Sequence, residues 1–123
     1  SETYYVIEID GVSIGSKNQN MCVFGCSAIV DTGTSLLVVP EQYGSQLIKN
    51  IGEVKSDCSN WKTLPDISFK IAGNEFKVGP VEYVLEQNGQ CQLGIQSMAN
   101  FPYWILGDVF IRAQTTVFDQ GNN

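Results

Sequence analysis

A polar turn of five residues, Asp31-Thr32-Gly33-Thr34-Ser35, separates two apolar, β-prone runs at residues 28–30 and 36–39. This pattern predicts a buried strand that ends in a sharp bend at Asp31, followed by a second buried strand. Gly33 permits a close backbone approach that a Cβ would block, and the three hydroxyls can hydrogen-bond the carboxylate or neighbouring backbone. The segment therefore has the parts of an oriented acid, although Asp, Thr and Gly are also what an ordinary tight turn contains.

Histidine is absent from the 123 residues. Its absence excludes Ser-His-Asp and Cys-His nucleophile pairs and the commonest transition-metal ligand, so acid–base chemistry must fall to carboxylates. The net charge of −6, with only seven basic residues, argues against a nucleic-acid partner or an anionic membrane surface. The sequence has no apolar run of membrane-spanning length and no signal peptide at Ser1-Glu2-Thr3. If the protein is exported, this chain is therefore expected to be a processed or excised piece of it.

Four cysteines can pair in three ways, and the sequence alone does not choose between them. The spacing favours Cys22 with Cys26, which would close a small loop before the strand that leads to Asp31, and leaves Cys58 to pair with Cys91. Zinc binding is the alternative, but one Cys-x3-Cys with two distant cysteines and no histidine is poor ligand spacing. Two disulfides would imply a secretory route, with a secreted, lysosomal or vacuolar destination.

The segments around the bend read as mostly β. Residues 4–9 alternate as a half-buried strand, and Asp10-Gly11 predicts a turn into a second strand over residues 12–14, which makes the opening a hairpin. A second hairpin is predicted further along, with its strands and turn at residues 67–72, 73–74 and 76–78. A short helical turn beginning at Pro80 then leads into a strand over residues 91–95.

One helix is clear in the sequence. Pro40 suits the first turn of a helix, Gly52 can end it, and the apolar residues between them repeat at helical spacing, namely Tyr43, Leu47, Ile48 and Ile51. The polar loop that follows, residues 53–63, is anchored by Cys58, and its Trp61 is interpreted as a packing residue.

A second informative stretch is Tyr103-Trp104-Ile105-Leu106-Gly107-Asp108 and its continuation to Arg112. Its first half predicts a buried strand that ends in glycine. Asp108 is then placed to cap a short helix over residues 109–112, so it is interpreted as a structural acid and not as a second catalytic one.

The sequence resembles the pepsin-like aspartic proteases, of the pepsin and cathepsin D type. The resemblance rests on Ala-Ile-Val-Asp-Thr-Gly-Thr-Ser-Leu-Leu at residues 28–37, on Leu-Gly-Asp-Val-Phe-Ile-Arg at residues 106–112, on the Leu-Pro-Asp-Ile turn at residues 64–67, and on the cysteine layout. It implies that residues 1–123 form a single, incomplete C-terminal lobe of the bilobal pepsin-like fold, mostly β with one clear helix and short helical turns. It also implies the disulfides Cys22–Cys26 and Cys58–Cys91, and a strand Ile105-Leu106-Gly107 that runs beside the catalytic loop and supports it.

The resemblance also implies a role for each residue of the bend. Asp31 would be this lobe's catalytic acid, Thr34 would hydrogen-bond its outer oxygen, and Thr32 would reach across to the matching loop of the other lobe. Gly33, Thr34 and Ser35 would bind the substrate backbone. Ile105 and Met98 would form apolar walls of side-chain pockets, although an ordinary core position is the alternative for both, and for Met98 in particular.

The implied reaction is peptide-bond hydrolysis by a water molecule held between two aspartates that share a proton. No metal or organic cofactor is implied. Only one Asp-Thr-Gly is present, so the partner would be an N-terminal lobe that carries the second aspartate, and the chain alone is expected to be inactive. Substrates would be extended peptides or proteins.

Two other functions remain open at this stage. A homodimeric aspartic protease is one, but the cysteines, the length and the lack of a flap-like glycine-rich hairpin count against it. A non-catalytic binding protein with a pepsin-like fold is the other, and the residue that would decide lies outside these positions. The chain ends at Asp119-Gln120-Gly121-Asn122-Asn123, where relatives are expected to continue into another apolar strand.

Overall fold

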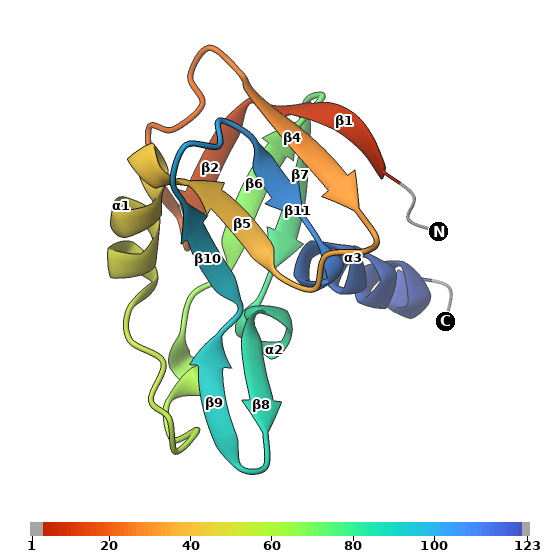
Figure 1. The fold of residues 1–123 in the computed structure, drawn as a ribbon. Coiled ribbons are helices and arrows are strands. Elements are labelled where there is room, and N and C mark those ends of the chain that lie inside the picture. The colour runs from red at the N-terminus through yellow and green to blue at the C-terminus, as the bar shows by residue number, and fades with distance from the viewer. Residues whose placement is uncertain (1–3, 122–123) are drawn as a thin grey trace.

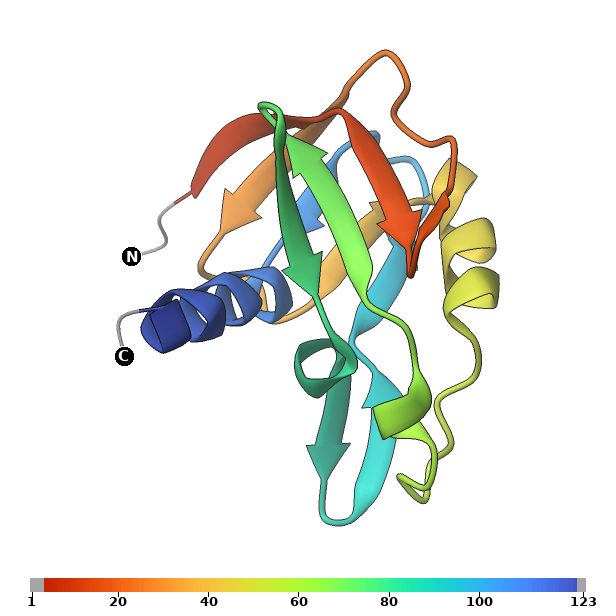
Figure 2. The same ribbon diagram turned by 180° about the vertical axis from the view of Figure 1, so that it is seen from behind.

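Two β-sheets form the body of the molecule, seen from opposite sides in Figure 1 and Figure 2. The computed structural model describes residues 4–121, with side chains up to residue 115. One sheet has five strands in the order β1-β4-β11-β5-β10, and the other has four in the order β3-β2-β6-β7. A separate hairpin, β8-β9, extends beyond both sheets at the bottom of Figure 1. The prediction of a mostly β fold is confirmed.

The five-stranded sheet brings together strands that are distant in sequence: β1 (Tyr4–Ile9), β4 (Cys26–Asp31), β5 (Leu37–Pro40), β10 (Ile95–Met98) and β11 (Trp104–Leu106). β11 lies between β4 and β5, parallel to the first and antiparallel to the second. The predicted strand, bend and strand around Asp31 are therefore confirmed. The predicted strand before Gly107 is also confirmed, and it pairs with both arms of the bend.

The four-stranded sheet shows that the predicted opening hairpin is wrong. This sheet consists of β2 (Gly11–Ile14), β3 (Lys17–Asn18), β6 (Ile67–Ile71) and β7 (Asn74–Val78). β1 pairs with β4, whereas β2 pairs with β3 and β6. Gly11 does not adopt a positive φ, and the Asp10 N–H donates to the Lys70 carbonyl oxygen at 2.7 Å. The chain therefore continues from one sheet into the other instead of turning back.

Two tight hairpins follow the first half of the chain. The predicted hairpin β6-β7 is confirmed, with its turn at Ala72 (φ 54°) and Gly73 (φ 82°), one residue earlier than expected. A further helical turn, α2 (Pro80–Tyr83), leads into the hairpin of β8 (Val84–Gln87) and β9 (Gln90–Leu93). Its turn residues, Asn88 and Gly89, both have positive φ, which is the geometry that Asn-Gly favours. β8 was not predicted, and the predicted strand over residues 91–95 is in fact most of β9 and the first residue of β10 (Ile95–Met98).

The core lies between the two sheets and centres on Trp104 of β11, which is fully buried. Its ring stacks on Tyr43 of the first helix at a centroid distance of 5.8 Å and meets the edge of Phe69 of β6, also at 5.8 Å. Such aromatic pairs add to the stabilisation that comes from burial of their apolar area. Trp104 thus fixes the strand beside the bend against a helix and the second sheet.

The helix α1 (Glu41–Ile51) confirms the predicted helix, with Pro40 before its first residue and Gly52 at its end. Gly52 has a φ of 100°, which favours glycine, and its N–H donates to the Ile48 carbonyl. The buried face of α1 includes Gly44 and Leu47, and it packs beside β10 and β5 (Figure 1). None of the helices within residues 4–121 is long and apolar enough to cross a membrane.

The last helix, α3 (Asp108–Gly121), is longer than the predicted helix over residues 109–112. No Gly or Pro occurs between residues 108 and 120, so nothing in the sequence interrupts it. Val109, Phe110 and Ala113 are buried at helical spacing. The predicted cap is also different: Asp108 is the first helical residue, and its carboxylate accepts a hydrogen bond from Arg112 Nε at 2.8 Å.

Both favoured disulfides are present, Cys22–Cys26 and Cys58–Cys91, and no cysteine is free. The first closes a short loop before β4. The second joins the loop after α1 to β9, and it is reinforced by a hydrogen bond from the Cys91 N–H to the Ser56 carbonyl at 2.9 Å. A short 3-10 helix, η1 (Trp61–Thr63), lies in the same loop.

The Cys58–Cys91 disulfide should contribute more stability than Cys22–Cys26, because it closes a separation of 33 residues instead of four. Replacing Cys58 and Cys91 together by Ala should lower the free energy of unfolding by about 2–4 kcal/mol. The double Ala variant at Cys22 and Cys26 is the matched control and should lose less. Denaturant unfolding of both variants measures the difference, and an equal or smaller loss for the longer loop would contradict it.

Candidate functional site

The site begins where β4 ends, at Asp31, and continues through the bend to Leu37, the first residue of β5. β11 fills the space between these two strands, with Leu106 paired to Val30 on one side and to Leu37 on the other. The bend is therefore closed at its base by the end of a third strand. In Figure 1 the loop from β4 to β5 passes beside the start of α3.

Two hydrogen bonds orient the Asp31 carboxylate. The Gly33 N–H donates to Oδ1 at 2.9 Å, and the Thr34 hydroxyl donates to Oδ2 at 3.0 Å. Asp31 itself is half-buried. Each carboxylate oxygen thus has one partner inside the loop, and its remaining lone pairs can accept hydrogen bonds from a bound group.

The backbone of the loop is also fixed. The Thr34 N–H donates to the Asp31 carbonyl at 3.3 Å, and the Asp108 N–H donates to the Thr34 carbonyl at 2.7 Å. Gly107, just after β11, approaches so closely that a Cβ there would overlap the carbonyl oxygens of Thr34 and Leu36. The glycine at the end of β11 is therefore required by packing against the loop.

The other predicted residues of the bend lie at its surface. Thr32, Gly33 and Ser35 are exposed, and Thr34 is half-buried. Their positions next to Asp31 allow hydroxyls and backbone groups to meet a molecule that approaches the carboxylate. The structure thus brings Asp31, Thr32, Gly33, Thr34 and Ser35 together on one loop.

The two predicted apolar wall residues have different positions. Ile105 pairs with Ile29, two residues before Asp31, so both lie on the same face of the sheet as the acid. Met98 pairs with Pro40 at the last position of β5, whereas the bend joins the first. Met98 therefore lies at the opposite end of β5 from the bend, because β10 runs away from the bend in parallel with β5.

Tyr4 also lies at the candidate site, although no sequence pattern predicted it there. It lies directly opposite Asp31 in the β1-β4 pair and is 66% exposed. Val6, which pairs with Ile29, is 63% exposed on the same face. An apolar strip of Tyr4, Val6, Ile29 and Ile105 therefore runs along the sheet beside the acid. The sequence did not predict this strip, because the expected hairpin paired β1 with β2 instead of β4.

Asp108 does not share this environment with Asp31. Its carboxylate is exposed and paired with Arg112 one turn along α3, while its backbone N–H donates to the loop. Within residues 4–121, no three His, Cys, Asp or Glu side chains come together in a way that could hold a metal ion. The site is thus a single oriented carboxylate on a clamped loop.

The fold and the Asp31 loop are those expected of a lobe of an aspartic protease, and comparison with known families gives the same class. The family model for eukaryotic aspartyl proteases matches residues 1–123, and the chain belongs to this family.

Individual relatives give the same result. The chain is 44% identical to gastricsin of Oryctolagus cuniculus over 99% of its own length and 34% of the relative's. It is 44% identical to pepsin A of Gallus gallus over 100% of its length and 35% of the relative's. It is 42% identical to gastricsin of Homo sapiens over 99% of its own length and 34% of the relative's. The chain therefore spans about a third of the length of these relatives.

Proposed function

We propose that this chain is the C-terminal lobe of an aspartic endopeptidase and that Asp31 is one of its two catalytic acids. The observation that carries the proposal is the Asp31 carboxylate, held by Gly33 and Thr34 on a loop that β11 and Gly107 clamp from below. Membership of the aspartyl protease family supports it. The second aspartate would come from an N-terminal lobe, so residues 1–123 alone would be inactive.

The proposed chemistry uses a water molecule bound between the two carboxylates. Two such groups at short distance cannot both ionise readily, so one keeps its proton while the other removes a proton from the water. The water oxygen attacks the scissile carbonyl, and the protonated carboxyl donates to the carbonyl oxygen. Collapse of the tetrahedral diol breaks the C–N bond: the amine leaves with the proton that the first carboxyl took from water, and the other carboxylate takes back a proton from a diol hydroxyl, which restores the starting pair. No metal or organic cofactor is needed in this scheme.

The exposed groups around Asp31 fit an extended peptide substrate. Gly33, Thr34 and Ser35 offer backbone and hydroxyl groups at the surface of the loop, and Thr32 would bond to the matching loop of the other lobe. Ile105 and Tyr4 flank the acid and would contact substrate side chains. Met98, which pairs with Pro40 at the other end of β5, would contact a substrate side chain further from the acid.

The apolar strip beside Asp31 supports the need for a partner lobe. Tyr4 and Val6 are largely exposed on β1, which is an edge strand of its sheet among the described residues. Apolar side chains that adjoin an unpaired strand edge are typical of a surface that another chain or domain covers. The isolated chain should therefore self-associate as its concentration rises, and sedimentation measurements that find only monomers would contradict this.

The test of the proposal is a chimaera in which this chain replaces the matching third of Oryctolagus cuniculus gastricsin. Cleavage of a peptide at acid pH by the chimaera, and no cleavage by residues 1–123 alone, would support a two-lobe protease. Activity of the isolated chain that rises with the square of its concentration would instead identify a homodimer. A folded chimaera without activity would favour a non-catalytic protein.

The hydroxyl of Thr34 should contribute more to the activity of the chimaera than its methyl group does. Thr34→Val in the chimaera removes the hydrogen bond to Asp31 Oδ2 and should lower kcat/KM about tenfold or more, since hydrogen bonds to charged groups contribute about 1.5–3 kcal/mol. Thr34→Ser keeps the hydroxyl and should stay within a few-fold of the parent. Equal losses in the two variants would show that packing, and not the hydrogen bond, is what the site requires.

The two disulfides fit a protein of the secretory pathway. We propose a secreted, lysosomal or vacuolar destination on this basis, and the resemblance to pepsin and cathepsin D favours compartments that are acidic.

A further inference from the structure

The loop that leads into β4 carries a fully exposed aromatic side chain. Phe24 is 99% exposed, and its neighbour Val23 is 67% exposed. Both lie inside the short loop that the Cys22–Cys26 disulfide closes, and we call residues 22–26 the apolar knob. The core of the chain gains nothing from these two side chains, so their apolar surface is free to be buried against another molecule.

The apolar knob is held in one conformation by its own bonds. The Gly25 N–H donates to the Cys22 carbonyl at 2.9 Å, which makes the two apolar residues the central pair of a β-turn. The Tyr43 hydroxyl lies 3.8 Å from Cys26 Sγ, so α1 supports the knob from one side. Because the disulfide and these contacts fix Phe24 before any partner arrives, little conformational entropy is lost on binding.

A hollow of about 510 Å³ lies at the same end of the five-stranded sheet as the knob. It is lined by the start of α1 and by the loop before β11, namely Pro40, Glu41, Gln42, Asn100, Phe101 and Pro102. The parallel register that pairs Trp104 with Ala28 puts the loop before β11 beside the segment before β4. Both segments lie in the upper part of Figure 1 and Figure 2. The hollow is within the size range of binding pockets and can receive an aromatic ring.

We propose that two copies of this chain form a two-fold dimer in which Phe24 of each copy occupies the hollow of the other. Phe24 does not fill the hollow of its own chain, because the turn holds it 99% exposed. A second copy can supply the missing contact, since knob and hollow lie at one end of the molecule and a two-fold axis there joins both pairs at once. The ring would pack on Phe101, and the Gln42 amide at the rim would bond to peptide groups of the turn.

The proposed dimer is separate from the acid on the β4-β5 loop. Asp31 is at the end of β4, whereas the knob ends at Cys26, the first residue of that strand. The two Asp31 carboxylates would therefore lie at the far ends of the dimer and could not share a water molecule. The dimer does not depend on whether Asp31 is catalytic.

The experiment is sedimentation of the chain in a Val6→Lys background, where the new charge on the edge strand β1 suppresses association through the strip beside Asp31. Physiological salt screens the net charge of −6 on each copy, and a monomer–dimer equilibrium is expected. Phe24→Ser should weaken the dimer about 10²-fold or more, because a two-fold interface loses the contact twice. Gln42→Trp, which fills the hollow from its rim, should also weaken it.

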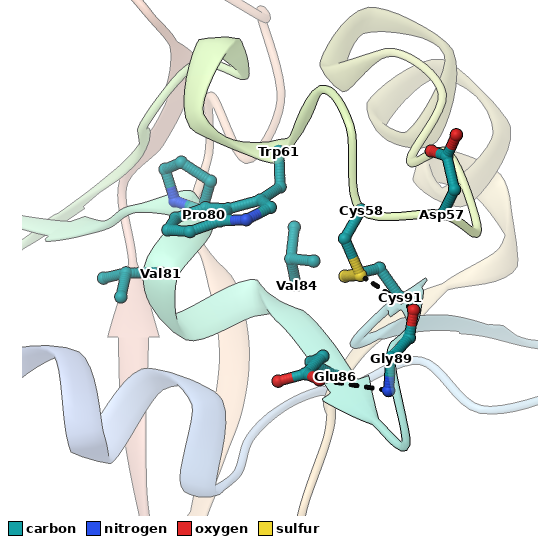
Figure 3. Close-up of a pocket in the computed structure, with 9 residues that line it drawn as sticks. All are labelled: Asp57, Cys58, Trp61, Pro80, Val81, Val84, Glu86, Gly89 and Cys91. Carbon is teal, nitrogen blue, oxygen red and sulfur yellow. Dashed lines mark hydrogen bonds between the residues drawn. A yellow bond between two sulfur atoms is a disulfide. The ribbon is translucent and has the colours of Figure 1, made fainter.

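Two exposed valines provide a matched control. Val23 is 67% exposed and Val81 is 62% exposed, but Val81 lies on α2, at a separate pocket beside Trp61 and Pro80 (Figure 3). Val23→Ser should weaken the dimer about tenfold, since it removes apolar contact area next to Phe24. Val81→Ser should leave the dimer unchanged. Neither valine belongs to the core, so the unfolding midpoint should stay the same in both variants.

Isotope-filtered NOE measurements on mixed labelled and unlabelled chains check the contact directly. They should connect the Phe24 ring of one copy with Phe101 of the partner subunit. Monomers at every concentration up to the solubility limit would overturn the proposal, and so would a dimer that Phe24→Ser leaves intact. A monomer that binds phosphatidylcholine vesicles through Phe24 would overturn it as well and would assign the knob to a lipid surface.

Discussion

Replacing Asp31 by Asn in the chimaera should lower the rate of peptide cleavage at acid pH by about 10³-fold or more. Asn has nearly the same shape: its amide oxygen can accept from the Gly33 N–H and its NH2 group can donate to the Thr34 hydroxyl, in place of the two hydrogen bonds that hold the carboxylate at 2.9 and 3.0 Å. It cannot take or release a proton. Proton transfer by a positioned side chain typically contributes about 10²–10⁴-fold to a rate, and here one group would serve both halves of the reaction.

The matched control for this substitution is Asp108→Asn. Asp108 is also an aspartate next to the bend, but its carboxylate is paired with Arg112 on the surface of α3. Its contact with the loop is through the backbone N–H, which Asn retains. Initial rates of the two variants, with the unfolding midpoint of each as a check on folding, measure the difference. Activity that survives in Asp31→Asn would exclude Asp31 as a catalytic acid.

The sequence was sufficient to predict the segment that carries the candidate site. The polar turn between two apolar runs, the glycine after Ile105-Leu106 and the helix between Pro40 and Gly52 are local patterns, and each has the predicted structure. The disulfides were also predicted, since spacing and the family resemblance agreed on one pairing. Local signals succeed here because turn chemistry, apolar periodicity and capping all favour the same structure.

Strand pairing was harder to predict from the sequence, because it depends on contacts between residues far apart in the chain. Asp10-Gly11 is a common turn pair, but the ladder between β2 and β6 is extended by the hydrogen bond from Asp10 to Lys70. This long-range contact prevailed over the local turn preference, and β1 pairs instead with β4, with Tyr4 opposite Asp31. Met98 shows the same dependence, since its distance from the bend follows from β10 running parallel to β5.

Gly107→Ala should be among the most damaging single substitutions in the chain. The new Cβ would overlap the carbonyl oxygens of Thr34 and Leu36 and would lie 2.9 Å from the Thr34 carbonyl carbon. These are backbone atoms of the loop that holds Asp31, so they cannot move aside as the end of a flexible side chain can. Overpacking a core commonly costs about 1–3 kcal/mol and occasionally more. We expect a loss of at least about 4 kcal/mol, at the upper end for point substitutions.

Gly11→Ala is the control that separates this clash from the general effect of adding a methyl group to a strand. A Cβ at Gly11 would meet Lys70 Cβ at 3.7 Å, an ordinary contact, and the residue does not adopt a positive φ. Its variant should therefore lie within about 1 kcal/mol of the parent, because Ala also restricts the unfolded chain. Denaturant unfolding followed by the fluorescence of buried Trp104 compares the two. Similar stability of both variants would mean that the β4-β5 loop can shift away from β11, and the clamp proposed for Asp31 would then be wrong.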